Sequence, residues 1–514
     1  MALSENTHFT KGANGGNLRF EEKLWLVADK LRGHVETSEY KHIVLGLIFL
    51  KYISDRFYER YRKLASQSCS DPENRDEYAG IFWVPEEARW LNLGLQTHQP
   101  RLAELVDSAM AVIEEANLPL KGVLPKNYAR IPLGNQRLGE LIDLIGAINL
   151  SDGENRTQDI LGRVYEYFIG RFARMEGKGG EFYTPSSIVR LLVEMIEPYK
   201  GSVYDPCCGS GGMFIQSEKF VLAHGGTMGD LSIFGQELNP TTWRLCKLNL
   251  ALREIDGDIG SHPADSFHDD LHPELKADFV LANPPFNISD WGGEYLRSDK
   301  RWRYGMPPVG NANFAWIQHI VHHLNSSGVA AFILTNGSLS GGQDKLDGEI
   351  RKALIEADLV DCIVALPANL FYNTQIAACI WIIARDKQDG RFRKRNGSTL
   401  LIHAHQFGQM IDRVHSELSD ADIALIANAY HAWRNKDRCY EDIPGFCKSA
   451  TLNEIRSHKW ALVPGRYVGF DTGLSRPLDD NSLHMEIEQI EERVGEIAKV
   501  SASALSVLKE LLYG

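Results

Sequence analysis

The fold is most clearly indicated by one segment, Phe279-Val280-Leu281-Ala282-Asn283-Pro284-Pro285-Phe286. Its first four residues form a short apolar run of the kind that makes a buried strand. Two prolines end that strand, because proline has no N–H group to donate to a neighbouring strand. The amide of Asn283, the carbonyl of Pro284 and the ring of Phe286 are therefore expected at the carboxyl end of a strand. In open α/β sheets, ligands bind in the crevice beyond such ends.

Apolar strand candidates alternate with helical segments on both sides of this corner. The strand candidates are Ser202–Asp205, Ser232–Gln236, Asp278–Ala282, Val329–Thr335, Leu359–Leu366 and Ile376–Ala384. After the second of them, a helix is expected to begin at its N-cap Asn239, with Pro240 in the first helical position, and to end at Asp256-Gly257. The alternation predicts an α/β fold with a mainly parallel, doubly wound sheet.

Helical spacing of apolar residues dominates the first 150 positions. Helices are expected over residues 20–32, 39–64, 101–116 and 135–148, and little there has the pattern of a strand. We therefore expect an all-helical N-terminal domain over residues 1–150. A further amphipathic helix is expected over Thr157–Met175.

The tail of the chain has a different pattern, a heptad seam along Leu483–Leu512. It predicts a C-terminal helix within residues 478–514. Such a helix either packs on its own domain or is offered to a partner subunit, and assembly of subunits is the role predicted for it.

The composition is that of a globular chain, with 514 residues of which 44% are hydrophobic and 24% charged. This length predicts two or three domains. The longest apolar stretch, Ile43–Leu50, is too short to cross a bilayer and is expected to be a buried helix. The N-terminus lacks the basic and then apolar pattern of a signal peptide, so a cytoplasmic location without membrane contact is expected.

Cysteine usage and net charge further restrict the functions that the chain can have. The eight cysteines form no CxxC pair, so reduced thiols are expected and no metal site is predicted. The formal net charge is −13. Non-specific DNA affinity comes mostly from Lys and Arg residues that neutralise phosphates. A chain this acidic either does not act on DNA or relies on a partner for much of the binding surface.

A glycine-rich loop and two acidic residues precede the Asn283 corner. The loop reads Asp205-Pro206-Cys207-Cys208-Gly209-Ser210-Gly211-Gly212 and lies between a strand candidate and a helix, where a ligand can approach the backbone. Taken alone, it is equally typical of a tight strand–helix turn. Glu237 follows the next strand and can accept hydrogen bonds from both hydroxyls of a ribose. Asp265 follows the expected third strand, where its carboxylate can accept from an adenine amino group.

With this loop, Glu237, Asp265 and NPPF in this order, and FYTP upstream at Phe182–Pro185, the chain resembles a DNA adenine-N6 methyltransferase that uses S-adenosyl-L-methionine. More narrowly, it is similar to the modification (methyltransferase, M) subunit of type I restriction–modification systems. The resemblance includes EEKLWLVADKLRG near the N-terminus, GRVYEYFIGRFA before GGEFYTP, and LVPGRYV at Leu462–Val468.

The resemblance implies a Rossmann-like, seven-stranded methyltransferase sheet with one reversed strand, for which Ile376–Ala384 is the candidate. It makes residues 155–470 the catalytic domain. It also assigns residues to the cofactor: Phe182, Thr184 and Pro185 at the methionine end, Asp205, Gly209, Ser210 and Gly211 in the loop, Glu237 at the ribose and Asp265 at the adenine.

The same resemblance places the target base at Asn283, Pro284 and Phe286. The chemistry of these residues agrees, because the Asn283 side-chain oxygen and the Pro284 carbonyl can accept both hydrogens of an adenine N6 amine. That geometry directs the lone pair of the amine at the methyl group, and orientation is a main source of rate. Phe286 can stack on a base flipped out of the duplex.

The implied function is site-specific DNA adenine-N6 methylation within a hetero-oligomer. The implied partners are DNA, a specificity (S) subunit, a restriction (R) subunit and a second copy of this M subunit. Two alternatives stay open: a methyltransferase for protein glutamine or RNA, whose nitrogens NPP-aromatic corners also hold, and a non-catalytic assembly subunit. Four basic residues after the corner are expected either to touch DNA phosphates or to lie in a solvated loop: Arg297, Lys300, Arg301 and Arg303.

Overall fold

The computed structural model describes residues 37–67, 70–147, 164–172, 183–341, 345–371 and 376–469, and five single residues, Glu22, Trp25, Leu26, Ala28 and Asp29. Those five are all helical and belong to the helix predicted over residues 20–32. Phe182 and the predicted C-terminal helix, 478–514, lie outside the described residues.

Among the described residues of the N-terminal part, the regular structure consists of helices and 3-10 turns, as predicted. Its helices are α2 (Thr37–Ala65), α3 (Trp90–Gly94), α4 (Leu102–Ala116) and α5 (Asn135–Gly146), with 3-10 turns η1 (Arg75–Tyr78), η2 (Glu86–Ala88) and η3 (Leu118–Leu120). The apolar stretch Ile43–Leu50 is buried in α2, which confirms that prediction. Tyr165 and Phe168, from the helical residues 164–172, are buried in the same core.

The remainder of the described chain is built on a nine-stranded sheet. The strands are β1 (Gly201–Asp205), β2 (Leu231–Gly235), β3 (Gly257–Asp258), β4 (Ala277–Ala282), β5 (Leu324–Thr335), β6 (Val360–Ala365), β7 (Ala378–Ala384), β8 (Ser398–His403) and β11 (Cys447–Thr451). Their spatial order is β11-β8-β6-β7-β5-β4-β1-β2-β3. A separate small hairpin pairs β9 (Gln409–Met410) with β10 (Ser416–Glu417).

Strand β7 is the reversed strand, antiparallel to both β5 and β6, as predicted for Ile376–Ala384. The pairs β3–β2, β2–β1, β1–β4 and β4–β5 are all parallel. The predicted seven-stranded methyltransferase sheet is confirmed in the order β3-β2-β1-β4-β5-β7-β6. Two further strands, β8 and β11, widen it beyond β6.

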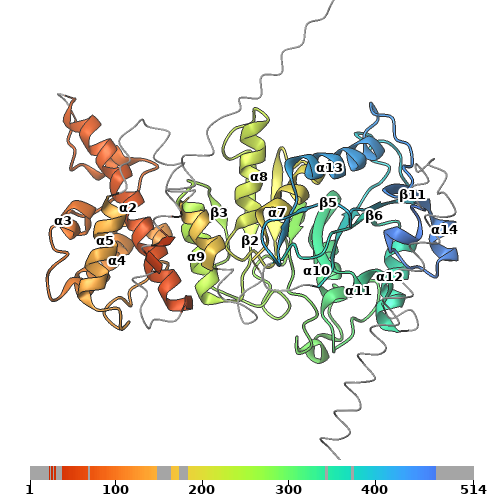
Figure 1. Ribbon diagram of the computed structural model, residues 1–514, viewed down its shortest axis with the longest axis horizontal. Coiled ribbons are helices and arrows are strands. Elements are labelled where there is room, and N and C mark those ends of the chain that lie inside the picture. Colours follow the sequence, from red (N-terminus) through yellow and green to blue (C-terminus); the bar gives the residue numbers. More distant parts are fainter. Residues whose placement is uncertain are drawn as a thin grey trace, which may run out of the picture.

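Helices cover both faces of the sheet (Figure 1). One face carries α7 (Ser186–Ile196), α8 (Gly212–Ala223) and α13 (Asp420–Arg434); the other carries α10 (Asn313–His323), α11 (Gly337–Ser340), α12 (Leu346–Glu356) and α14 (Leu452–Ser457). Strand side chains alternate between the two cores, since Val203 lies in the first and Tyr204 in the second. The 3-10 turns η5 (Gly293–Leu296) and η6 (Pro464–Arg466) lie in connecting segments.

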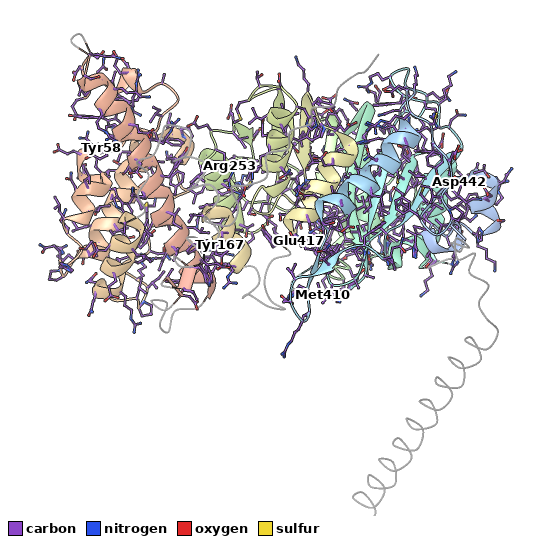
Figure 2. The ribbon with its side chains drawn as sticks, turned by 45° about the horizontal axis from the view of Figure 1, so that its top comes forward. Tyr58, Tyr167, Arg253, Met410, Glu417 and Asp442 are labelled. Carbon is purple, nitrogen blue, oxygen red and sulfur yellow. The ribbon has the colours of Figure 1, made fainter. Side chains whose placement is uncertain are left out.

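Helix α9 (Pro240–Ala251) joins the helical part to the sheet. Its N-cap is Asn239, as predicted, and the Asn239 side chain accepts from the N–H of Thr241 at 2.8 Å. The helix ends earlier than predicted, because the chain turns back where Glu254 adopts a left-handed conformation with φ of 58°. Just beyond the helix, Arg253 pairs with Glu166 at 2.8 Å, and Figure 2 labels Arg253 where the two parts meet.

Within the described ranges, no helix combines the length and the apolar character needed to cross a bilayer.

A buried ion pair attaches the added part of the sheet to β6. Asp361 in β6 accepts from Arg395 Nε at 3.1 Å and from the Tyr430 hydroxyl of α13 at 2.7 Å. The side chains of Asp361 and Arg395 are 0% and 3% exposed. Because both charges are fully desolvated, the pair constrains the geometry more than a surface ion pair would.

Replacing Arg395 with Met leaves Asp361 buried without its counter-charge. We expect the free energy of unfolding of the sheet to fall by about 3–5 kcal/mol, measured by urea denaturation followed by tryptophan fluorescence. The double variant Asp361→Leu, Arg395→Met has no buried charge and is expected to recover most of that loss. A double variant as unstable as the single one would contradict this interpretation.

Candidate functional site

The residues predicted for the site gather at one edge of the sheet. Strands β1, β2 and β4 are parallel neighbours, so their carboxyl ends meet at this edge. Asp205 ends β1, Glu237 lies just past β2, and Asn283 follows β4 directly. Backbone hydrogen bonds hold the segments together, from Gln236 N to the Asp205 carbonyl and from Ala264 N to the Glu237 carbonyl, both at 3.0 Å.

The Asn283 side chain is oriented by Thr184. Its Nδ2 donates to Thr184 Oγ1 at 2.8 Å. Its Oδ1 is buried and has no hydrogen-bond partner among the described residues. A buried acceptor that is left unsatisfied is destabilising by about 1–3 kcal/mol. The geometry leaves this oxygen available to a donor brought by a ligand.

Phe286 and its neighbours fix the turn that follows the two prolines. Phe286 is buried, and Phe371 meets it edge to face with ring centroids 5.6 Å apart. Asn287 has a left-handed φ of 55°, which Asn tolerates better than most residues. Its N–H donates to Asn313 Oδ1 at 3.1 Å, and its Oδ1 accepts from Asn313 Nδ2 at 2.9 Å. The sequence did not reveal Phe371 or Asn313, which come from distant segments.

The glycine-rich loop turns directly into α8. Gly209 and Gly211 have left-handed φ values of 56° and 81°. A Cβ on Gly211 would meet Cys246 Sγ at 2.9 Å, whereas a Cβ on Gly209 would meet no heavy atom of the described residues within 4 Å. Gly211 is therefore required for packing, while Gly209 borders open space. The carbonyl of Ser210 is held by Asn249 Nδ2 at 2.7 Å.

Glu237 faces this loop. One of its carboxylate oxygens accepts from Gly209 N at 3.0 Å and the other from Asn239 N at 2.8 Å. Asp265 is half-buried and accepts from Phe267 N at 2.8 Å. Both carboxylates are thus oriented by backbone N–H groups at the ligand edge of the sheet.

Asp205 is the most deeply buried acid of the site, 2% exposed. Burial raises the pKa of its carboxyl to about 7, against the opposing effect of the hydrogen bond from Cys207 N at 3.0 Å. Nearby Glu237 raises it further. Pro185 is also buried and forms the N-cap of α7, next to Thr184. Phe182, the remaining predicted cofactor residue, lies outside the described residues.

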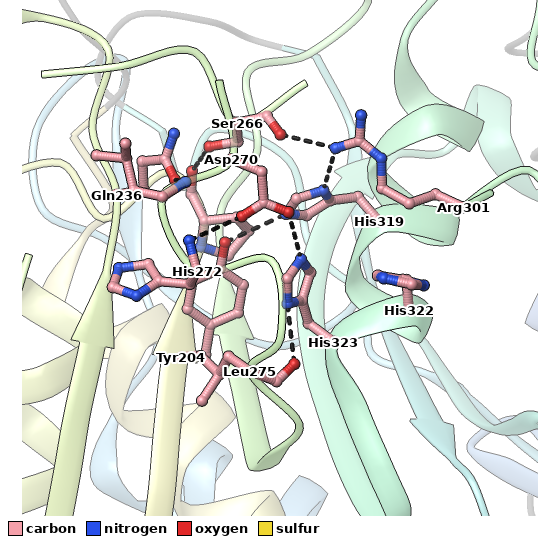
Figure 3. A network of polar contacts seen from close by, with 12 residues as sticks. Tyr204, Gln236, Ser266, Asp270, His272, Leu275, Arg301, His319, His322 and His323 are labelled. Carbon is pink, nitrogen blue, oxygen red and sulfur yellow. Dashed lines mark hydrogen bonds and ion pairs between the residues drawn. The ribbon is translucent and has the colours of Figure 1, made fainter. Parts of the chain in front are cut away.

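A cluster of Asp270, His319 and His323 lies behind these loops, with one ligand atom of each within 4.8 Å of the others (Figure 3). The sequence prediction of no metal overlooked it, although His319 and His323 have the four-residue spacing of one helix face. The ligand atoms already have partners, since Asp270 Oδ2 meets His323 Nε2 at 3.0 Å and His319 Nε2 meets the Tyr204 hydroxyl at 3.2 Å. We interpret the cluster as a hydrogen-bonded network.

Charge supports that interpretation. Arg301 Nη1 donates to His319 Nδ1 at 3.0 Å, and a guanidinium beside a ring nitrogen opposes the binding of a cation there. Burial, with His323 and Arg301 nearby, holds the pKa of His319 well below its usual range. The hydrogen bond from His323 and its charge outweigh burial and hold the pKa of Asp270 below its usual range.

Arg301 corrects one expectation from the sequence. It was expected with Arg297, Lys300 and Arg303 in a solvated or phosphate-binding loop. Its side chain is 5% exposed, because its donors are all directed at acceptors inside the protein. The other three side chains are exposed.

Known protein families match this chain over both its helical part and its sheet. The family model described as N-6 DNA Methylase matches residues 156–473, and that of the HsdM N-terminal domain matches residues 20–145. The sheet, the glycine loop and the NPPF corner thus belong to one recognised class. The chain is a member of the N-6 DNA methylase family and, within it, of the methylase subunits of type I restriction enzymes.

Individual relatives agree over most of the chain. The HindI type I methylase subunit of Haemophilus influenzae is 48% identical over 408 residues, 75% of this chain and 90% of that protein. The MjaIX subunit of Methanocaldococcus jannaschii is 38% identical over 96% of this chain and 91% of its own length. A crystal structure of a type I methyltransferase subunit from Streptococcus thermophilus superimposes with a TM-score of 0.75 at 25% identity, covering 88% of this chain and 99% of that one.

The raised pKa of Asp205 makes stability depend on pH. In the unfolded chain the carboxyl has an ordinary pKa near 3.8, so between about pH 4 and pH 7 the folded state binds a proton that the unfolded state releases. Folding therefore weakens as pH rises through this window, by about 1.4 kcal/mol for each unit of pKa difference. Asp205→Asn lacks this dependence.

We expect the stability difference between Asp205→Asn and the unmodified protein to shift in favour of the variant from pH 4 to pH 7 and then level off, as measured by thermal unfolding at each pH. Glu454→Gln serves as a control of opposite sign, because the pKa of that half-buried residue is lowered to about 2, so its stabilising contribution rises with pH up to about pH 5 and then levels off. A difference that stays constant would show that Asp205 is ionised throughout.

Proposed function

We propose that the chain transfers a methyl group from S-adenosyl-L-methionine to the N6 amine of an adenine in DNA, as the modification subunit of a type I restriction–modification complex. The observation that carries this proposal is the buried Asn283 Oδ1, which is oriented by Thr184 and lacks a partner among the described residues. It stands at the end of β4, beside the glycine loop after β1. Family membership supports the same reaction class.

The target-base site consists of Asn283, Pro284 and Phe286. An exocyclic amine is a weak nucleophile, because its lone pair is delocalised into the ring. Asn283 Oδ1 and the Pro284 carbonyl accept its two hydrogens, which favours a tetrahedral nitrogen with a localised lone pair. Phe286, packed at nearly a right angle to the ring of Phe371, supplies an aromatic face for a base that has left the stack. Positioning and preorganised acceptors then supply most of the rate.

The residues around the glycine loop fit S-adenosyl-L-methionine, which supplies an electrophilic methyl group on its sulfonium sulfur when it is bound. Gly209 borders open space, so a ligand can approach the backbone of the loop at this residue. Glu237 is oriented to accept from the ribose hydroxyls, and Asp265 from the adenine amino group. Four more residues complete the proposed cofactor set: Asp205 in the loop and Phe182, Thr184 and Pro185 at the methionine end.

The proposed assembly follows from charge and from the family. With a formal net charge of −13, the chain needs a more basic partner to hold DNA. We propose DNA, a specificity subunit, a restriction subunit and a second copy of this chain as its partners. We further propose a helical domain over 1–150, a catalytic domain over 155–470 and an assembly helix within 478–514; the matches to residues 20–145 and 156–473 support the first two.

Replacing Asn283 with Ala removes one acceptor for the amine and is expected to lower the methyl transfer rate by at least about 100-fold. The affinity for S-adenosyl-L-homocysteine is expected to fall much less than the rate, because the substitution costs the proposed cofactor set one hydrogen bond, that of Thr184. The measurement is single-turnover transfer of labelled methyl to duplex DNA by the reconstituted complex. Asn428→Ala, on the exposed side of α13, is the matched control. Transfer at the rate of the unmodified protein would falsify the assigned role of Asn283.

Replacing Phe286 with Ala removes the stacking face and is expected to weaken binding of the extruded base by about 1–3 kcal/mol, the range for base–aromatic stacking. Phe286→Trp retains an aromatic face and is expected to lose less. Fluorescence of 2-aminopurine at the target position reports the extrusion directly. Equal fluorescence in all three proteins would argue against stacking on this ring.

A further inference from the structure

Arg301 lies in the loop between Phe286 and α10, and every N–H group of its guanidinium has an acceptor. Nε and Nη2 donate to the Asp299 carboxylate at 2.9 and 2.6 Å. Nη1 donates to the Ser266 carbonyl at 2.8 Å and to His319 Nδ1 at 3.0 Å. Nη2 also donates to the Phe267 carbonyl at 2.5 Å. These five bonds match the five donors of an arginine, and a lysine cannot reproduce them.

Two of these acceptors belong to the segment proposed to hold the cofactor's adenine. Ser266 and Phe267 follow Asp265 directly, and the Asp265 carboxylate is itself held by Phe267 N. Ser266 Oγ in turn donates to the carbonyl of Pro206 at 2.5 Å, in the glycine-rich loop. Arg301 therefore holds the backbone on which the cofactor contacts are mounted, although it has no direct place in them.

A second path leads from Arg301 to β1. Because arginine only donates, His319 Nδ1 must accept, and the neutral ring then carries its hydrogen on Nε2. That nitrogen faces the hydroxyl of Tyr204 at 3.2 Å, and Tyr204 precedes Asp205 in β1 (Figure 3).

The loop that contains Arg301 is itself a packed unit. Trp291 and Trp302 from this loop pack with Phe267 and with Trp316 of α10 in a small apolar core. The ring centroids of Phe267 and Trp316 are 4.2 Å apart. The loop after Phe286 and the Asp265 segment are therefore in direct contact through these rings.

We propose that Arg301 is a positioning residue that couples the Asp265 segment to the loop after Phe286, so that cofactor and DNA strengthen each other's binding. This inference rests on the proposed function, because it takes the Asp265 segment as part of the cofactor site and the loop after Phe286 as part of the target-base site. Coupling of this kind is reciprocal and is typically about 5- to 150-fold in affinity.

The test measures the dissociation constant of S-adenosyl-L-homocysteine by calorimetry, using the complete complex with and without an unmethylated duplex. The duplex carries the sequence that methylation-sensitive sequencing identifies in cells expressing the complex. For the unmodified protein, DNA is expected to tighten cofactor binding at least about fivefold. In Arg301→Lys this factor is expected to fall to about one, whereas Arg303→Lys, an exposed neighbour, is expected to retain it.

The factor by which DNA tightens cofactor binding distinguishes a positioning role from a merely structural one. A structural defect lowers the affinity equally with and without DNA and leaves the factor unchanged, which would overturn the proposal. If Arg301→Lys does not fold, His319→Leu and His319→Gln replace it: Gln offers an acceptor to Arg301 and a donor to Tyr204, so it is expected to keep more of the factor than Leu. Equal factors in Leu, Gln and unmodified protein would also overturn it.

Failure of the proposed function gives a different result. If the unmodified complex does not bind S-adenosyl-L-homocysteine, the proposed function fails. If it binds the compound but DNA does not change the affinity, the coupling fails and the proposed function stands.

Discussion

Two consecutive prolines end β4 between two paired neighbours, and the geometry of the site depends on that stop. Strand β4 is hydrogen-bonded to β1 on one side and to β5 on the other, so its end lies inside the sheet rather than at an outer strand. Pro284 and Pro285 cannot donate and take the chain out of the sheet. Asn283, just before them, is left with its amide held by Thr184 and its buried oxygen unsatisfied within the described protein. This arrangement makes the corner complementary to a donor from outside.

The contact that orients Asn283 depends on parts of the chain far from the corner. Thr184 precedes α7, and α7 is held against α13 by ion pairs between Arg190 and Asp420 and between Arg434 and Glu197. Helix α13 is in turn joined to β6 by the hydrogen bond from the Tyr430 hydroxyl to Asp361, which also pairs with Arg395. Helix α13 thus links α7, and with it the segment that contains Thr184, to the central sheet.

Local patterns in the sequence predicted the strands, the helix cap and the strand end that depend on residues close together in the chain. Each of the six predicted strands is present, because short apolar runs bounded by polar residues have few other stable arrangements in water. The cap of α9 and the end of β4 follow from single residues, Asn239 and Pro284. Strands β8 and β11 were not predicted, since the pattern weakens after residue 395 and their partners are distant in the chain.

The site features that the sequence did not reveal depend on contacts between residues far apart in the chain. Thr184 and Asn283 are 99 positions apart, so no spacing rule connects them. Arg301 was grouped with its exposed neighbours by sequence, but three of its five hydrogen bonds go to residues 266, 267 and 319, which only the folded chain brings close to it. Burial of a charged residue depends on such remote partners, and a one-dimensional pattern does not record them.

The central claim is that the corner after β4 holds the N6 amine of an adenine for methylation. The most direct measurement is nucleoside mass spectrometry after the reconstituted complex has acted on unmethylated DNA with S-adenosyl-L-methionine carrying a deuterated methyl group. The account predicts the label in N6-methyladenine and in no other nucleoside, and its loss when Asn283 is replaced with Ala. Label in a methylated cytosine, or in protein or RNA instead of DNA, would contradict it.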